Sequence, residues 1–327
     1  MTLNICQFSK RLLFCLALFF TLPLWAQTYP NKPIRIIIPY IAGGPADVMI
    51  RAVCQKLGDN WGQPFVVDNK PGANEIIGAD TVAKSPGDGY TFLVASDATF
   101  TLNQNLYSKL PYDPLKDLVP VTKLVIGNLM LVVRPDFPAN NIAEFIEYAK
   151  RHPGTLNYAS IGAGSVNHLF STWFNSINGL QMEHIPFKGI PPAVQEIMAS
   201  RVDSMFAITG GVAPYLDSNK LKGLAVSGKS RQPVAPKVPT FWELGYTNFD
   251  SSYYIGIAAP KGTPADILTR LAKDMSSIVN TDEFKLKYLQ PLGFDAVGDT
   301  PDQFAAFLKT DRDLGAQKVK VSGAKLD

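Results

Sequence analysis

Two glycine-containing segments hold the residues of this sequence that could recognise a small anion. The first glycine loop (residues 40–47) and the second glycine loop (residues 160–165) each lie between a predicted strand and a predicted helix. Glycine lets backbone N–H groups come close to a ligand, and the first turn of a helix has free N–H donors with a partial positive charge. The sequence therefore predicts an anion site at each loop. The alternative is that these glycines only form strand–helix turns, which bind nothing. One site in each of two loops that face each other would suit a ligand with two acidic ends.

Polar side chains in and beside these loops are candidates for contact with a ligand. Ser160 and Ser165 have hydroxyl groups, which are good donors to a carboxylate. Asp47 could fix the first loop, or water in it, around a bound group, but as a helix N-cap it would need no ligand. His168 follows one turn into the helix after the second loop, where it could face a cleft or bond to the backbone.

Two further segments follow predicted strands and would complete a cleft at the carboxyl ends of those strands. They are residues 96–100 and 186–189, in which Phe100 and Phe187 could give apolar walls and Lys188 a charge. His184 lies in a predicted strand, where side chains point alternately to the two faces. We expect its role to be structural. The predicted ligand-binding residues are Tyr40, Gly43, Gly44, Asp47, Ser96, Thr99, Phe100, Ser160, Gly164, Ser165, His168, Phe187, Lys188 and Gly189.

The elements that must position these loops alternate between strand and helix. Short β-branched or apolar runs read as buried strands, and the segments between them have helical spacing. This alternation predicts an α/β fold with mostly parallel sheets. The predicted strands are residues 34–38, 65–67, 91–95, 118–126, 129–133, 156–159, 182–185, 204–207, 223–226 and 253–258, and the predicted helices are 47–57, 76–84, 142–151, 165–178 and 191–200, with an almost entirely helical tail over 264–320.

A doubly wound sheet rarely grows to this length as one unit, so we divide the chain into two lobes. The predicted strands over 118–126 and 253–258 could each run from one lobe to the other. Two crossings make one lobe discontinuous. We therefore expect residues 27–125 plus 256–327 in the first lobe and residues 126–255 in the second.

Residues 1–26 have the form of an export signal that is cleaved near Ala26. Lys10 and Arg11 precede an apolar run over 12–24. That run is shorter than the roughly 20 residues of a membrane-spanning helix. An uncleaved membrane anchor is the alternative.

The rest of the chain argues against several function classes. Without the signal it has 29 positive and 28 negative side chains, which disfavours binding to nucleic acid or to a membrane surface. Cys54 is then its single cysteine, so no internal disulfide can form. The sequence has no cysteine–histidine cluster and no G-x-S-x-G motif, and we expect no metal and no cofactor. Residues 223–230 match a phosphate-loop pattern, but a predicted strand falls inside the motif and prolines follow its lysine, which argues against an ATP site.

Several motifs resemble the Bug-type receptors, the extracytoplasmic solute-binding proteins of tripartite tricarboxylate transporters (TctC-like). The motifs lie at residues 29–40, 43–47, 69–73, 88–91, 110–114, 156–158, 186–189, 238–240 and 258–264. The resemblance covers residues 29–327. It implies a two-lobed periplasmic binding protein fold (type II-like) that closes on a small carboxylate without catalysis. It also implies a periplasmic monomer that delivers its ligand to inner-membrane permease subunits, and we expect the hinge near Ile126 and Ile255.

Three differences from that family narrow the range of ligands that we expect. Many relatives have prolines where Ile41 and Ala42 stand, a polar group near Phe100, and an aspartate after the strand that ends at Ala207. Without that acid, the ammonium group of an amino acid would lack a partner. We expect a dicarboxylate, either aromatic such as terephthalate or aliphatic such as adipate, ahead of citrate or malate.

Two other functions fit the sequence. A receptor that reports to a signalling partner would have the same sequence features. A secreted serine hydrolase acting on esters or amides, with one of the serines as nucleophile, is the alternative from another class. Turnover separates the two classes, because a binding protein returns its ligand unchanged.

Overall fold

The computed structural model describes residues 29–247, 249 and 252–326 of the 327-residue chain. The predicted export signal at residues 1–26 lies outside the described residues. The chain separates into two units, residues 1–31 and 32–327, and every helix and strand given below belongs to the second. Among the described helices, none combines the length and the apolar character needed to span a membrane.

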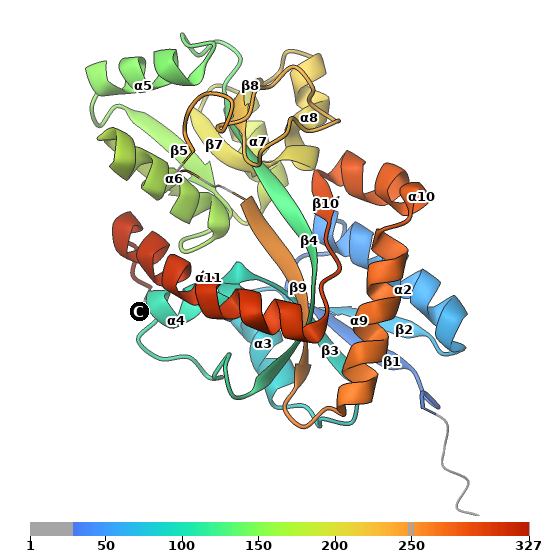
Figure 1. Cartoon of the computed structure of the whole chain (residues 1–327). Helices are drawn as coiled ribbons and strands as arrows, with labels where there is room; N and C mark the ends of the chain where they lie inside the picture. Colours follow the sequence, from blue (N-terminus) through green and yellow to red (C-terminus); the bar gives the residue numbers. More distant parts are fainter. Residues whose placement is uncertain (1–28, 248, 250–251, 327) are drawn as a thin grey trace, which may run out of the picture. The chain divides into compact units, whose positions relative to one another are not determined.

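Within the described residues, ten strands form one sheet in the order β2-β1-β3-β9-β4-β7-β5-β6, with β8 and β10 also paired to β4 (Figure 1). The strands are β1 (Ile34–Ile38), β2 (Phe65–Asn69), β3 (Thr91–Ser96), β4 (Leu118–Val133), β5 (Leu156–Ser160), β6 (Met182–Pro186), β7 (Ser204–Ile208), β8 (Lys222–Val226), β9 (Ser252–Pro260) and β10 (Phe294–Ala296). Strands β1 to β3 form one parallel group, and β5 to β7 form another.

Strand β4 joins the two parallel groups, because its first part pairs with β9 and its second part with β7 and β8. All pairings of β4 and β9 are antiparallel, so the predicted predominance of parallel strands is wrong. The two predicted strands 118–126 and 129–133 are one continuous strand. Gly127 lies inside this strand under the ring of Tyr253, and an added Cβ would stand 2.3 Å from that ring.

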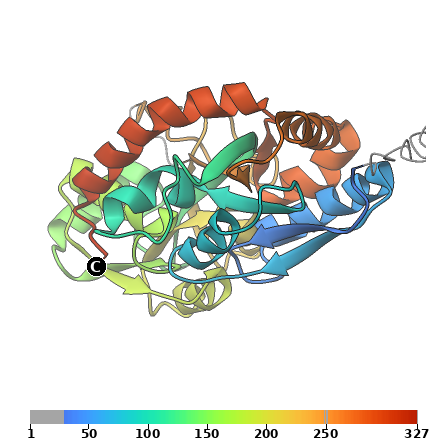
Figure 2. The ribbon, with the colours of Figure 1, turned by 90° about the horizontal axis from the view of Figure 1, so that it is seen from below.

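Helices cover the sheet and cap the ends of its strands. They are α2 (Pro45–Trp61), α3 (Ile76–Ala83), α4 (Asn103–Leu106), α5 (Ile142–Arg151), α6 (Val166–Asn178), α7 (Ile190–Met198), α8 (Thr209–Asp217), α9 (Ala265–Val279), α10 (Asp282–Phe284) and α11 (Pro301–Ser322), with shorter turns η1 (Ala98–Leu102), η2 (Lys285–Leu289) and η3 (Gln290–Leu292). Figures 1 and 2 show that α11 runs from the neighbourhood of α9 to that of α6, and it also contacts β4 and η1.

Three local assignments differ from the sequence prediction. Helix α2 begins at Pro45, which occupies its first turn, instead of at Asp47. Helix α8 was not predicted, because Gly210, Gly211 and Pro214 are poor helix formers. Strand β10 interrupts the tail that was predicted to be almost entirely helical.

The phosphate-loop pattern at residues 223–230 has the structural context that the sequence predicted. Strand β8 ends at Val226, inside the pattern. No helix follows between residues 227 and 240, all of which the structure describes. The glycine and lysine amides therefore do not open a helix that could hold a phosphate.

We expect Gly256→Ala in β9 to lower the free energy of unfolding by about 1–3 kcal/mol, because it overfills a packed site. The added Cβ would stand 2.5 Å from the ring of Phe304 and 3.3 Å from that of Phe100. Urea denaturation followed by circular dichroism measures the change. The matched control is Gly211→Ala, whose Cβ would meet its nearest neighbour at 3.6 Å. Being helical, the control should be unchanged or more stable by up to about 1 kcal/mol. Equal stabilities for the two variants would contradict close packing at Gly256.

Candidate functional site

The carboxylate of Asp47 holds the first glycine loop between β1 and α2. It accepts the backbone N–H of Gly43 at 2.9 Å, Nε of Arg51 at 2.9 Å and Nδ2 of Asn69 at 2.8 Å. Burial works to raise the pKa of Asp47, but the hydrogen bonds from Arg51, Gly43 and Asn69 outweigh it and hold that pKa below its ordinary value. Asp47 is not the N-cap of α2, because Gly44 occupies that position. Its role is to fix the loop.

The first turn of α2 keeps donors for an anion. The backbone N–H groups of the first helical residues have no partner within a helix. In α2 these include the amides of Ala46 and Asp47, whereas Val48 already donates to the carbonyl of Gly44 at 3.0 Å. The 17-residue helix also places its positive dipole end at this point. The geometry here is compatible with the predicted anion site.

Glu75 is a buried carboxylate that the sequence analysis missed, and it collects three of the predicted ligand-binding residues. Its side chain accepts the hydroxyl of Tyr40 at 2.8 Å and that of Thr99 at 2.7 Å. Ser96 donates its backbone N–H at 3.0 Å and also its hydroxyl. Glu75 is 7% exposed. These hydroxyl hydrogens are bonded to the protein's own carboxylate, so the role predicted for them in holding a ligand carboxylate has a competitor.

No local signal in the sequence indicates Glu75. A glutamate just before a predicted helix usually reads as a solvated residue or a helix start. Burial of its charge follows from contacts that are distant in the chain, with the residue after β1 and with the end of β3.

Phe100 lies in the hydrophobic core of the structure. Its ring packs against Phe304 at 5.3 Å and Tyr254 at 6.2 Å between centroids, and it is almost fully buried. The π-helical turn η1 directs it inward from the end of β3. Of the two aromatic walls that the sequence predicted, Phe187 is the one that is half-buried after β6. Lys188 beside it is exposed.

The second glycine loop uses several of its own amides. Gly162 donates its N–H to Oγ of Ser160 at 3.0 Å, and Gly164 donates to Nδ1 of His168 at 3.1 Å. Ser165 donates its hydroxyl to the carbonyl of Gly162 at 2.7 Å and caps α6 by accepting the N–H of His168. The donors left by this arrangement are the first amides of α6, at Val166 and Asn167. The free donors at this loop therefore belong to the helix end and not to the glycines.

Two imidazole rings stack behind the second glycine loop. The centroids of His168 and His184 are 4.1 Å apart, and Nε2 of His184 lies 2.6 Å from Oγ of Ser160. Burial, and then the neighbouring His184, lowers the pKa of His168 to about 4. Burial lowers the pKa of His184 as well. The two rings are therefore neutral near pH 7 and can contribute hydrogen bonds, but not charge, to this loop.

Each glycine loop has a neighbour among the segments of the other side. An added Cβ on Gly189, at the start of α7, would stand 3.4 Å from the side chain of Ile41 in the first loop. Asn74 donates its side-chain amide to the carbonyl of Gly164 at 3.1 Å. The tip of Leu326 lies against Gly164 as well, and its backbone N–H donates to the carbonyl of Leu106 at 2.8 Å. Asn74 and Leu326 were not predicted as site residues.

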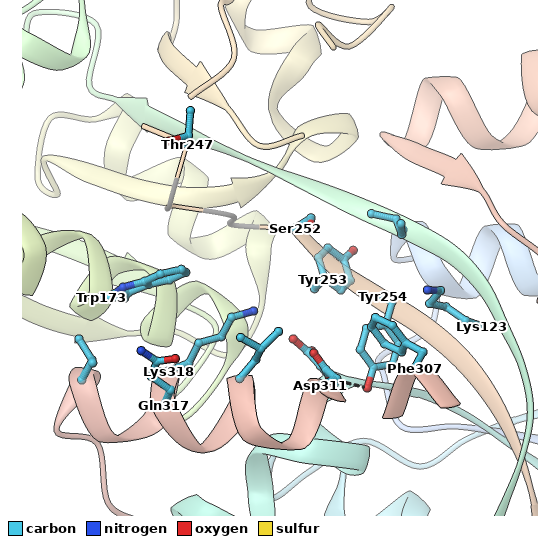
Figure 3. Close-up of a pocket in the computed structure, with 14 residues that line it drawn as sticks. Lys123, Trp173, Thr247, Ser252, Tyr253, Tyr254, Phe307, Asp311, Gln317 and Lys318 are labelled. Atoms are coloured by element: carbon cyan, nitrogen blue, oxygen red, sulfur yellow. Dashed lines mark hydrogen bonds between the residues drawn. The ribbon is translucent and has the colours of Figure 1, made fainter. Parts of the chain in front are cut away.

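A separate cavity of about 390 Å³ lies between α11, α6 and β9 (Figure 3). None of the predicted ligand-binding residues lines it. Its lining comprises Asp97, Lys123, Ile126, Trp173, Thr247, Ser252, Tyr253, Tyr254, Phe307, Asp311, Leu314, Gln317, Lys318 and Val321.

The family model and the similar proteins all indicate the same family. Residues 49–319 match the tripartite tricarboxylate transporter family receptor. The chain is 35% identical to protein BugT of Bordetella pertussis over 305 residues, which cover 93% of each chain. It is 36% identical over 246 residues to a protein in the gbd 5′ region of Cupriavidus necator, with 75% of this chain and 74% of that protein covered.

Solved structures agree with this fold. Periplasmic binding protein BugD is 31% identical with a TM-score of 0.81, covering 91% of this chain and 99% of that one. Rhodopseudomonas palustris Rpa4515 with adipate is 28% identical with a TM-score of 0.85, covering 91% and 100%. MatC from the same species with bound malate is 29% identical with a TM-score of 0.80, covering 89% and 100%. The predicted two-lobed α/β fold of a periplasmic binding protein is confirmed by these similarities.

We expect Glu75→Gln to lower the free energy of unfolding by about 2 kcal/mol, because its amide group would meet hydroxyl and backbone donors that need an acceptor. Urea denaturation at pH 7 measures the loss. Glu147→Gln on the exposed face of α5 is the control and should change stability by less than about 0.5 kcal/mol. A Glu75→Gln variant as stable as the control would show that the four donors do not depend on the charge.

We expect the protein to lose stability as the pH falls from 6.5 to 4, partly through His168. The unfolded histidine, with a pKa near 6.5, takes up a proton in this window, whereas the folded one, with a pKa of about 4, does not. The folded state is therefore disfavoured by about 2 kcal/mol at the lower end, after allowance for partial exposure of the ring. His168→Gln should flatten the pH dependence of the unfolding free energy between these values, and Thr172→Ser on the same helix should not. An unchanged slope in His168→Gln would contradict this assignment.

Proposed function

This chain belongs to the tripartite tricarboxylate transporter receptor family of periplasmic solute-binding proteins, and we propose that it captures a small dicarboxylate between its lobes and delivers it to a membrane permease. The observation that carries the proposal is the pair of helix N-termini at the two glycine loops. Helix α2 follows β1 and helix α6 follows β5, each at the carboxyl end of a parallel strand. Each can hold one carboxylate.

The neighbours of the two loops support a ligand that reaches both. Ile41 lies near Gly189, and Asn74 bonds to Gly164, so the segments on the two sides are within side-chain reach of each other. A ligand with a carboxylate at each end would suit the two helix N-termini, and its apolar middle would suit the side chains of Ile41 and Phe187. Tyr40, Ser96 and Thr99 support this site through Glu75.

A dicarboxylate is favoured over an amino acid by the state of the acids near the loops. Asp47 already accepts three donors and Glu75 four. An ammonium group would therefore compete with protein donors for either carboxylate. Two similar structures, Rpa4515 with adipate and MatC with bound malate, support this ligand class. Ile41 and Ala42 make the first glycine loop apolar. We therefore rank adipate-like and terephthalate-like compounds first among the dicarboxylates.

Closure would bring residues 27–125 plus 256–327 and residues 126–255 together around the ligand. The hinge proposed near Ile126 and Ile255 lies in β4 and β9, which pair at Val125↔Ile255 and Ile126↔Tyr254. The register of this pair shifts between Lys123 and Val125, and such irregularities bend a strand locally. The ligand shifts the equilibrium by as much as it prefers the closed form. Export would rest on the signal at residues 1–26.

The hydrolase alternative has one observation behind it, the short contact between Ser160 and His184. A nucleophilic hydroxyl must reach the substrate, but Ser160 is fully buried. Its Oγ also accepts the N–H of Gly162 and contacts the Gly162 carbonyl. These bonds give the pair a structural task in the loop, so we retain binding as the proposed function. The signalling alternative differs in its partner and not in this site.

The test is isothermal titration of the mature chain, residues 27–327, with adipate and terephthalate after removal of any endogenous ligand. We expect one ligand per chain, a melting temperature raised by several degrees, and ligand recovered unchanged. The monomethyl ester of the same acid should bind at least tenfold more weakly, because one helix N-terminus would lose its anion. If diacid and monoester bind equally, or if no dicarboxylate binds, the proposal is wrong.

A further inference from the structure

We propose that the cavity between α11, α6 and β9 is a second binding site, separate from the glycine loops, and that it takes a small organic ammonium ion with an apolar or aromatic body. Figure 3 shows Asp311 below Tyr253, with Trp173 and Lys318 to one side and Lys123 to the other. The volume of about 390 Å³ suits a compound of about ten to fifteen heavy atoms.

Two buried acids are among the polar residues that line the cavity. Asp97 is 4% exposed and Asp311 is 8% exposed, and both line the space. Asp311 accepts the hydroxyl of Thr101 at 2.9 Å and that of Tyr254 at 3.1 Å, both on Oδ2. Within the described residues, Oδ1 of Asp311 has no hydrogen-bond donor. The carboxylate is thus held in position by one oxygen and presents the other to a ligand.

Two lysines lie beside the cavity. Lys123 pairs with Asp299 at 3.4 Å and lies 3.7 Å from the ring centre of Phe307. Lys318 lies over Phe170 at 5.1 Å and Trp173 at 5.9 Å. Against these two cations stand the carboxyl groups of Asp97, Asp299 and Asp311. A bound ammonium ion would balance the set once Asp97 is ionised.

The remaining walls suit the body of such an ion. The rings of Trp173, Tyr253 and Tyr254 line the space together with the side chains of Ile126 and Leu314. Aromatic faces attract cations and also cover apolar surface. A dicarboxylate would instead place its charge beside Asp97 and Asp311, so this site and the glycine loops select ligands of opposite charge.

The ionisation of Asp97 gives this site a measurable signature. Burial raises the pKa of Asp97 to about 8, opposed by the charge of Lys318 and assisted by those of Asp311 and Glu75, with a small lowering by the Ser96 hydroxyl. Tyr253 also faces this group. A bound cation replaces the missing solvation of the carboxylate, so Asp97 should lose its proton when the ligand binds at pH 7.

The probe is benzylamine, which is cationic at pH 7, and the neutral comparison is benzyl alcohol, which has the same ring. We expect titration calorimetry of the mature chain to give one benzylamine site and at least tenfold weaker binding of benzyl alcohol. Repeating the titration in phosphate and in Tris buffer should give different heats, because a proton is released. Quenching of tryptophan fluorescence by benzylamine should be lost in Trp173→Phe.

Matched variants locate the site. Asp311→Asn and Asp97→Asn should each weaken benzylamine at least tenfold, while Asp313→Asn, an exposed acid on the same helix, should bind as the wild type does. Adipate should not compete with benzylamine, so failure here would not bear on the dicarboxylate proposal. The inference is wrong if benzylamine fails to bind at millimolar concentration, if benzyl alcohol binds equally well, or if Asp313→Asn weakens binding as much as the other two variants.

Discussion

The buried carboxylate of Glu75 holds the first glycine loop to the end of β3. Removing a charge from water is tolerated when hydrogen bonds replace the solvent, and here Tyr40, Ser96 and Thr99 supply them. Residues 73–75 all have left-handed backbone angles, with φ between 46° and 75°, each of which costs on the order of 1 kcal/mol. That conformation carries Asn74 to Gly164. One buried charge thus fixes the end of β3, the first loop and the contact to the second.

The antiparallel pair of β4 and β9 is the second constraint. It extends from Leu118↔Pro260 to Asn128↔Ser252, and β4 then continues into the other parallel group. The carboxyl ends of β1 and β5 are therefore oriented by a shared strand and not by loops. Helix α11 adds a second connection, since it contacts β4 and α6. The glycine loops and the cavity lie on elements that these two connections hold.

Local patterns predicted the elements that depend on nearby residues. The run 34–38 and the strand–glycine–helix order at both loops are short-range features, and the structure has them. Long-range packing decided the rest. Gly127 continues β4 because Tyr253 covers it, and Phe100 turns into the core because Phe304 and Tyr254 are there. Glu75 could not be found, since nothing in its neighbours along the chain distinguishes a buried glutamate from a solvated one.

The position of Leu326 affects how this protein can be turned into a sensor. Its backbone is bonded to Leu106, and its side chain touches Gly164 in the second glycine loop. A bulky group attached to the side chain of residue 326 would lie beside the loop and would press on it. The same closeness makes the position useful for a small environment-sensitive dye, because a change at Gly164 would alter the dye's surroundings directly.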